Sequence, residues 1–247
     1  RIELPRVGAV DVCAMVVPVY WDLASILVAK EIDAFKPSLV LMNGIAGARQ
    51  DLWIELGSVN QAMPLEDGSD ALKPLPPTGK SVAPIVPSAS RADERKGLLM
   101  SWSAVRDAAT REIEAQKNVE DDGATFGDLL PGVKLGGFPR SSNTYLCNNI
   151  TYVVNYLMSY PGRAVTLLKA STQVTGKTNQ VRTKISADAR KTPRVFMHWP
   201  SELADHPGHL KVAARVMATV IDAQLAASAP TVGDNAMADV TLSGDTF

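Results

Sequence analysis

The chain contains few of the residues that cross-link small proteins or bind metals. Its 247 residues include two cysteines, Cys13 and Cys147, and three histidines. Two cysteines are too few for a disulfide framework, so the fold has to be stabilised by a hydrophobic core. With 46% hydrophobic residues the chain can bury one full-sized core. We therefore expect a single domain over residues 1–247.

An excess of charge of one sign is also missing. The 25 Lys and Arg residues balance 26 Asp and Glu residues, for a net charge of -1, which gives no general attraction to nucleic acid or to anionic membranes. The apolar runs are interrupted well before the roughly 20 residues that a membrane span needs, and the first residues lack a signal-peptide pattern. These absences predict a soluble, cytoplasmic protein with no nucleic-acid or membrane partner.

The hydrophobic pattern predicts strands that alternate with helices. Residues 9–20 are apolar and β-branched, which is typical of a strand that would bury Cys13, and Asp22 is placed to cap a following helix. The continuous apolar run at 38–42 is typical of a central parallel strand. Strand, helix and strand in this order imply a right-handed crossover. We expect an α/β fold of three layers, α/β/α, around a twisted and mostly parallel central sheet.

Further elements are expected toward the C-terminus. Helices are predicted at 96–116, directly after Cys147 and at 209–227, and strands at 133–138 and 194–198. Three stretches rich in turn-forming or charged residues are expected to be irregular insertions: 64–95, 117–131 and 163–194. The last of these is basic, but no aromatic residues alternate with its Lys and Arg, so a solvated surface is favoured over an anion-binding patch.

Cys147 is placed where a cysteine can become reactive. It comes immediately before a segment of helical periodicity, and the unpaired amides at a helix N-terminus stabilise a thiolate. Glu55 follows a glycine-containing loop, and His198 ends an apolar run. Open α/β sheets collect their chemistry at the carboxyl edge of the strands, and a Cys–His pair oriented by a carboxylate performs acyl transfer. Each residue also has a structural alternative: a buried cysteine, a surface carboxylate, or a core histidine.

Three runs resemble the motifs of the pyroglutamyl peptidase I (pyrrolidone-carboxylate peptidase) family. The run GIAGAR at 44–49, with Glu55 and Asn60 after it, resembles the glutamate motif. The run YLCN at 145–148 resembles the cysteine motif, and FMHWP at 196–200 resembles the histidine motif. The three occur in the order found in the family, within a resemblance that spans about residues 10–225.

This resemblance implies a cysteine peptidase that removes N-terminal pyroglutamyl residues, acting on peptides with a blocked N-terminus. Cys147 would be the nucleophile, His198 the general base and acid, and Glu55 the carboxylate that holds the imidazolium. The implied substrate-binding residues are Tyr145, Leu146 and Asn60. The implied reaction needs no metal and no cofactor, and the sequence leaves a homo-oligomer open.

The sequence departs from the family at the walls of the expected pocket. Trp53 stands where the family has Ser or Thr, and Ser142 and Asn143 stand where it has Ala and Gly. Two alternatives therefore stay open: a related cysteine amidase with a different substrate, and a non-catalytic homologue that acts as a binding module.

The opening strand and loop of the family have no counterpart among the first residues of this sequence. The run at 238–247, ADVTLSGDTF, has the pattern of that strand and of the start of its loop. We hypothesise that the order of the chain is permuted and that the tail, 228–247, supplies the first strand. The alternative is a tail on the surface.

Overall fold

The computed structural model describes residues 1–247 except 48–49, 64–81, 142–143, 171–178, 228–230 and 233–247. The expectations for Ser142, for Asn143, for most of the 64–95 insertion and for the strand-like run at 238–247 lie outside the described residues.

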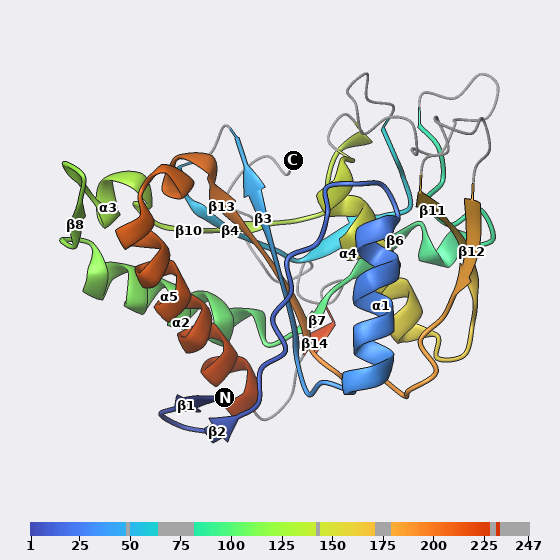
Figure 1. Cartoon of the computed structure of the whole chain (residues 1–247), viewed down its shortest axis with the longest axis horizontal. Coiled ribbons are helices and arrows are strands. Elements are labelled where there is room, and N and C mark those ends of the chain that lie inside the picture. Colours follow the sequence, from blue (N-terminus) through green and yellow to red (C-terminus); the bar gives the residue numbers. More distant parts are fainter. Residues whose placement is uncertain (48–49, 64–81, 142–143, 171–178, 228–230, 233–247) are drawn as a thin grey trace.

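A four-stranded sheet in the order β10-β4-β13-β3 runs through the middle of the molecule (Figure 1). β13 (Arg194–Pro200) pairs in parallel with β3 (Val40–Ala46) and antiparallel with β4 (Leu52–Glu55). β4 pairs in parallel with β10 (Val133–Gly136). Every residue of β13 is buried, because the sheet is covered on both faces. The expected central, mostly parallel sheet is confirmed.

Helices cover both faces of this sheet and complete the three layers (Figure 1). α1 (Leu23–Phe35) and α4 (Leu146–Ser159) lie together on one face. α2 (Trp102–Gln116), the short α3 (Phe126–Leu129) and α5 (Pro207–Ala226) lie on the other. The helices expected after Asp22, at 96–116, after Cys147 and at 209–227 are present as α1, α2, α4 and α5. α2 begins later than expected, at Trp102, because the residues before it form short strands.

Short antiparallel pairs surround the central sheet. They are β1 (Ile2–Leu4) with β2 (Gly8–Val10), β5 (Gly57–Val59) with β6 (Arg95–Gly97), β7 (Leu99–Met100) with β14 (Thr231–Val232), β8 (Glu120–Asp121) with β9 (Ala124–Thr125), and β11 (Val165–Ala170) with β12 (Asn179–Thr183). Two short 3₁₀ helices, η2 (Arg91–Asp93) and η4 (Ser201–Asp205), also occur among the described residues. The stretches 117–131 and 163–194, expected to be irregular, thus contain hairpins and α3.

The prediction of a strand over residues 9–20 with a buried Cys13 is wrong. The N-terminal strand β2 ends at Val10, and residues 11–18 have no regular secondary structure. Cys13 is exposed, and Val16 is 100% exposed. The expected crossover from this segment through α1 to β3 therefore has no first strand in the described part of the chain.

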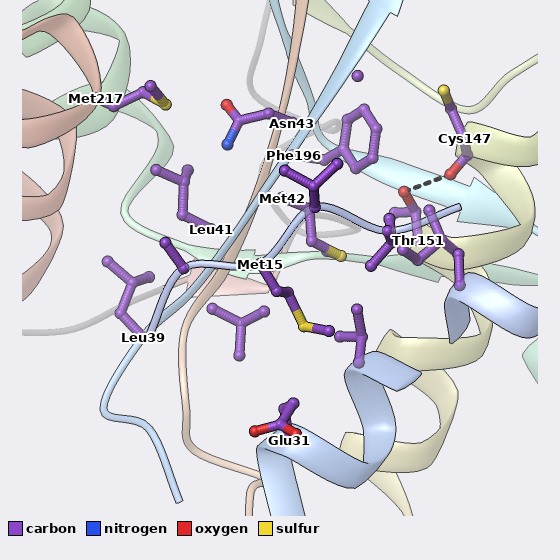
Figure 2. Close-up of a pocket in the computed structure, with 18 of the residues that line it drawn as sticks. Met15, Glu31, Leu39, Leu41, Met42, Asn43, Cys147, Thr151, Phe196 and Met217 are labelled. Atoms are coloured by element: carbon purple, nitrogen blue, oxygen red, sulfur yellow. Dashed lines mark hydrogen bonds between the residues drawn. The ribbon is translucent and has the colours of Figure 1, made fainter. Parts of the chain in front are cut away.

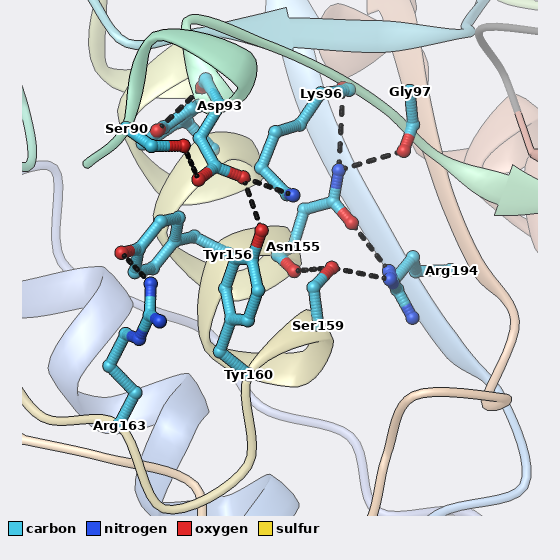
Figure 3. A network of polar contacts seen from close by, with 11 residues as sticks. Ser90, Asp93, Lys96, Gly97, Asn155, Tyr156, Ser159, Tyr160, Arg163 and Arg194 are labelled. Atoms are coloured by element: carbon cyan, nitrogen blue, oxygen red, sulfur yellow. Dashed lines mark hydrogen bonds and ion pairs between the residues drawn. The ribbon is translucent and has the colours of Figure 1, made fainter.

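A buried polar network fixes the second half of α4 (Figure 3). The hydroxyl groups of Tyr152 and Tyr160 donate to the backbone carbonyl and to the carboxylate of Asp93, at 2.8 and 2.7 Å. Burial alone would raise the pKa of Asp93, but hydrogen bonds from Ser90, Tyr160 and Lys96 lower it to about 2. These hydrogen bonds tie α4 and the residue after it to η2, which carries Asp93.

Candidate active site

Cys147 is the second residue of α4, and its position is fixed by the two asparagines that follow it. Asn148 pairs with the backbone of Val59, accepting from its N–H at 2.9 Å and donating to its carbonyl at 3.0 Å. Asn149 donates to Asp22 Oδ1 at 2.9 Å and accepts from Ser25 Oγ at 3.0 Å. The first turn of α4 is thereby tied to β5 on one side and to the start of α1 on the other.

Glu55 and His198 face each other on neighbouring strands. β4 and β13 run antiparallel with His198 opposite Trp53 and Phe196 opposite Glu55, so the diagonal pair is within side-chain reach. His198 Nδ1 lies 2.9 Å from Glu55 Oε1. Both side chains are buried, and a buried carboxylate is stable only when it is paired in this way.

The surroundings of His198 favour its protonated form. Burial alone would lower the pKa of the ring, but hydrogen bonds with Cys147 and Glu55, together with the charges of the same two groups, raise the pKa of His198 to about 9. An imidazolium beside a cysteine sulfur is the partner that a thiolate nucleophile requires. The ring also packs edge-on against Phe196, with ring centroids 4.7 Å apart.

Cys147 and His198 meet over Gly44. In the parallel pairing of β13 with β3, His198 lies opposite Gly44. A Cβ atom added to Gly44 would lie 2.9 Å from Cys147 Sγ and 3.1 Å from Cδ2 of the His198 ring. The missing side chain at this position is therefore what allows sulfur and ring to approach each other above the strand.

A second glycine makes room for the carboxylate. Gly136 of β10 lies opposite Glu55 in the parallel pairing of β10 with β4. A Cβ atom there would overlap Glu55 Oε2. Sequence reasoning did not identify Gly136 as part of the site, and the only available signal was a Gly-Gly pair at the end of a predicted strand.

The three residues open into a cavity of about 1560 Å³ that runs along β3 (Figure 2). Tyr145 and Leu146, expected to bind substrate, line this cavity together with Glu55, Cys147 and His198. Asn60 does not line it. Its side-chain amide donates to the carbonyl of Val86 at 3.1 Å and accepts from the N–H of Val86 at 2.8 Å. Asn60 is therefore a buried residue that holds the backbone of Val86 in place.

The two other histidines contact backbone oxygens. His206 Nδ1 lies 3.1 Å from the carbonyl of Asp121, and His209 Nε2 lies 3.1 Å from that of Ala124. Over the described part of the chain, no group of three or more His, Cys, Asp or Glu side chains could hold a metal ion. No helix among these residues is long and apolar enough to cross a membrane.

Comparisons with known proteins show what this arrangement is similar to. No family model matches the sequence, and no curated protein matches it. Among solved structures, the pyroglutamyl peptidase I of Bacillus amyloliquefaciens superposes with a TM-score of 0.54 and 11% identity, over 85% of this chain and 78% of that one. The pyrrolidone carboxyl peptidase of the hyperthermophile Pyrococcus furiosus superposes with a TM-score of 0.50 and 15% identity, over 85% of this chain and 79% of that one. At these identities the likeness shows a shared fold.

Proposed function

We propose that this chain, which has the fold of the pyroglutamyl peptidases, is a cysteine peptidase that removes N-terminal pyroglutamyl residues from peptides. The observation that carries the proposal is the continuous line of contacts from Cys147 through His198 to Glu55. A nucleophile, a base within hydrogen-bond reach and a third group that orients the base are together the signature of nucleophilic catalysis.

The residues divide the reaction into acylation and hydrolysis. Cys147 Sγ attacks the carbonyl carbon of the pyroglutamyl residue, and His198 takes the thiol proton and delivers it to the nitrogen of the leaving peptide. The amide C–N bond then breaks, and the pyroglutamyl group stays bound to Cys147 Sγ as a thioester. Water, deprotonated by His198, then attacks the thioester, and the thiol is restored as pyroglutamate leaves. Glu55 keeps Nδ1 of the imidazole protonated, so that Nε2 is the atom that exchanges protons.

The start of α4 supplies groups that stabilise the negative oxygen of the tetrahedral intermediate. The first amides of a helix have no partner within the helix, and they carry the positive end of its dipole. Cys147 lies in this first turn, after the extended residue Tyr145. The backbone N–H groups of Cys147 and Asn148 are the donors that we assign to this oxyanion site.

A matched pair of cysteine variants tests the proposal. The wild-type chain should release coumarin from a pyroglutamyl 7-amido-4-methylcoumarin, and Cys147→Ala should lower this turnover by about 10³-fold or more. Cys13→Ala removes the other thiol of the chain and should keep the activity. Alkylation of Cys147 by iodoacetamide without turnover of the pyroglutamyl substrate would indicate an amidase of other specificity. The absence of both would contradict the proposal.

A further inference from the structure

A second, smaller cavity lies at the opposite end of α4 from Cys147, next to Ser159. Its volume is about 270 Å³, below the roughly 300 to 1,000 Å³ of pockets that hold drug-sized ligands, so it suits a small ligand. None of the described residues that line it is acidic, and four are basic: Arg95, Lys96, Arg190 and Arg194. A cavity lined by charges of one sign attracts ions of the other sign, here anions.

Arg194, the first residue of β13, is buried although it is charged. It is only 4% exposed. Its Nε donates to Asn155 Oδ1 at 2.6 Å and its Nη2 to Ser159 Oγ at 3.0 Å (Figure 3). Its Nη1 donates to the carbonyls of Ala189 and Thr192, at 3.4 and 2.9 Å. A guanidinium has five N–H groups, so one N–H on Nη2 has no acceptor among the described residues.

All of these acceptors of Arg194 are neutral. Burial lowers the pKa of the guanidinium to about 10, so it is still charged at neutral pH, and no carboxylate of the described residues forms an ion pair with it. A buried charge without a counter-charge is costly. An anion in the adjoining cavity would supply the missing counter-charge and accept from the remaining N–H.

Two of the other three basic residues have carboxylate partners. Lys96 Nζ lies 2.9 Å from Asp93 Oδ1, and Arg190 Nη2 lies 2.7 Å from Asp188 Oδ2. Arg95 differs from both, because it is exposed and forms no ion pair with a described carboxylate. Arg95 and Arg194 therefore leave the cavity with two positive charges that no described residue balances, which matches a ligand with two negative charges.

We propose that this cavity binds a phosphate group, either as the free ion or as a small monoester. Arginine is the side chain whose planar fork of N–H groups matches the oxygens of phosphate. Arg95 of β6 and Arg194 of β13 would hold the ligand from two strands. The basic stretch 163–194, for which the sequence favours a solvated surface, thus contributes Arg190 and Arg194 to an anion site. None of these residues takes part in the proposed peptidase reaction.

Equilibrium dialysis with radiolabelled inorganic phosphate, in chloride buffer of fixed ionic strength, tests this site. The wild-type chain should bind phosphate saturably. Arg95→Gln should raise the Kd by about 10-fold or more, because it removes a charged donor, and Arg95→Lys, which keeps the charge, should raise it less. Arg91→Gln removes a nearby exposed arginine that does not line the cavity, and it should change the Kd by less than about 2-fold. The absence of saturable binding would overturn the proposal, as would equal effects of Arg95→Gln and Arg91→Gln, which indicate a general attraction to anions.

The buried arginine gives a second test. Arg194→Met should abolish phosphate binding, and a folded Arg194→Met chain that binds phosphate as the wild type does would overturn the proposal. If this variant does not fold, the comparison of Arg95→Gln with Arg91→Gln decides alone.

Competition distinguishes the two sources of the phosphate group. Glycerol 3-phosphate that displaces the label at a lower concentration than inorganic phosphate would identify a monoester as the better ligand, and the reverse order would identify the free ion. Phosphate should also raise the urea midpoint of the wild-type chain more than that of Arg95→Gln, because a ligand that binds the folded state stabilises it. Since no readout uses the pyroglutamyl substrate, a failure here is separate from a failure of the proposed function.

Discussion

Glu55 Oε1 and His198 Nδ1 lie 2.9 Å apart, although 143 residues separate them in the sequence. The contact is made by the antiparallel pairing of β4 with β13, and Gly136 on the next strand leaves the carboxylate the space it occupies. The orientation of the imidazole is therefore set by two neighbouring strands of the central sheet, which hold side chains more precisely than loops do.

The negative charge of Glu55 should be needed for full activity. Glu55→Gln keeps the size of the side chain but removes the charge that stabilises the imidazolium, so turnover of the pyroglutamyl coumarin amide should fall by about 10² to 10⁴-fold. The alkylation rate of Cys147 at neutral pH should fall as well. Glu202→Gln alters an exposed carboxylate of η4 and serves as the control. Equal activity of the two variants would remove Glu55 from the mechanism.

The raised pKa of His198 predicts how stability changes with pH. The ring has a pKa of about 9 in the folded protein and about 6.5 when unfolded. Its contribution is therefore complete below pH 6.5 and is lost as the pH rises through 9. The free energy of unfolding in urea should fall by up to about 3 kcal/mol over this window. His198→Gln should flatten the change, and a wild-type stability that rises over this window would contradict the assignment.

Gly44 should be intolerant of a single methyl group. In Gly44→Ala the new Cβ would crowd Cys147 Sγ and the His198 ring, so the two would have to move apart. We expect kcat/KM to fall by about 10-fold or more, since small displacements of reacting groups are costly. Gly47→Ala, in the loop after β3, meets no atom within 4 Å and should keep the wild-type value. Similar activities for the two variants would show that the contact over Gly44 is unimportant.

Asn60 should stabilise the fold rather than bind substrate. Asn60→Ala removes the partner of the buried N–H of Val86, whereas the carbonyl of Val86 still accepts from the N–H of Ala89. The loss should cost about 1 to 3 kcal/mol of unfolding free energy. Asn60→Asp keeps the acceptor for the N–H but places an unpaired buried carboxylate against the carbonyl of Val86, so at neutral pH it should cost at least as much. At a temperature where both variants are folded, KM should stay near the wild-type value. A rise in KM without loss of stability would restore Asn60 as a substrate-binding residue.

Local sequence patterns correctly predicted the elements that are largely buried in the core. The apolar run at 194–198 is the buried strand β13, and the residues after Cys147 form α4 as expected. The same reasoning failed for residues 11–18, because an apolar run indicates a strand only if another strand pairs with it, and the sequence alone does not show that pairing. It also assigned 163–194 to an irregular insertion, whereas Val165–Ala170 and Asn179–Thr183 form the hairpin β11–β12.

The placement of the site could be predicted in part. Strand ends and a helix start suggested that Glu55, Cys147 and His198 would come together, and in the structure the three side chains are neighbours. The expected reason, a shared carboxyl edge of parallel strands, applies to β3 and β13 but not to Glu55, because β4 runs antiparallel to β13. The roles of Gly44 and Gly136 could not be derived in this way. Both depend on cross-strand register, which places each glycine opposite His198 or Glu55, and register is a property of the assembled sheet.

The central claim is that Cys147 forms a thioester with the pyroglutamyl group, and its most direct test is mass spectrometry of the acid-quenched enzyme during turnover. The predicted result is a mass increase of one pyroglutamyl acyl group on the peptide that contains Cys147. Its amount should rise in the first turnover and be absent in Cys147→Ala. Turnover of the substrate by wild type with no acyl group on Cys147, or with unchanged turnover by Cys147→Ala, would contradict the account.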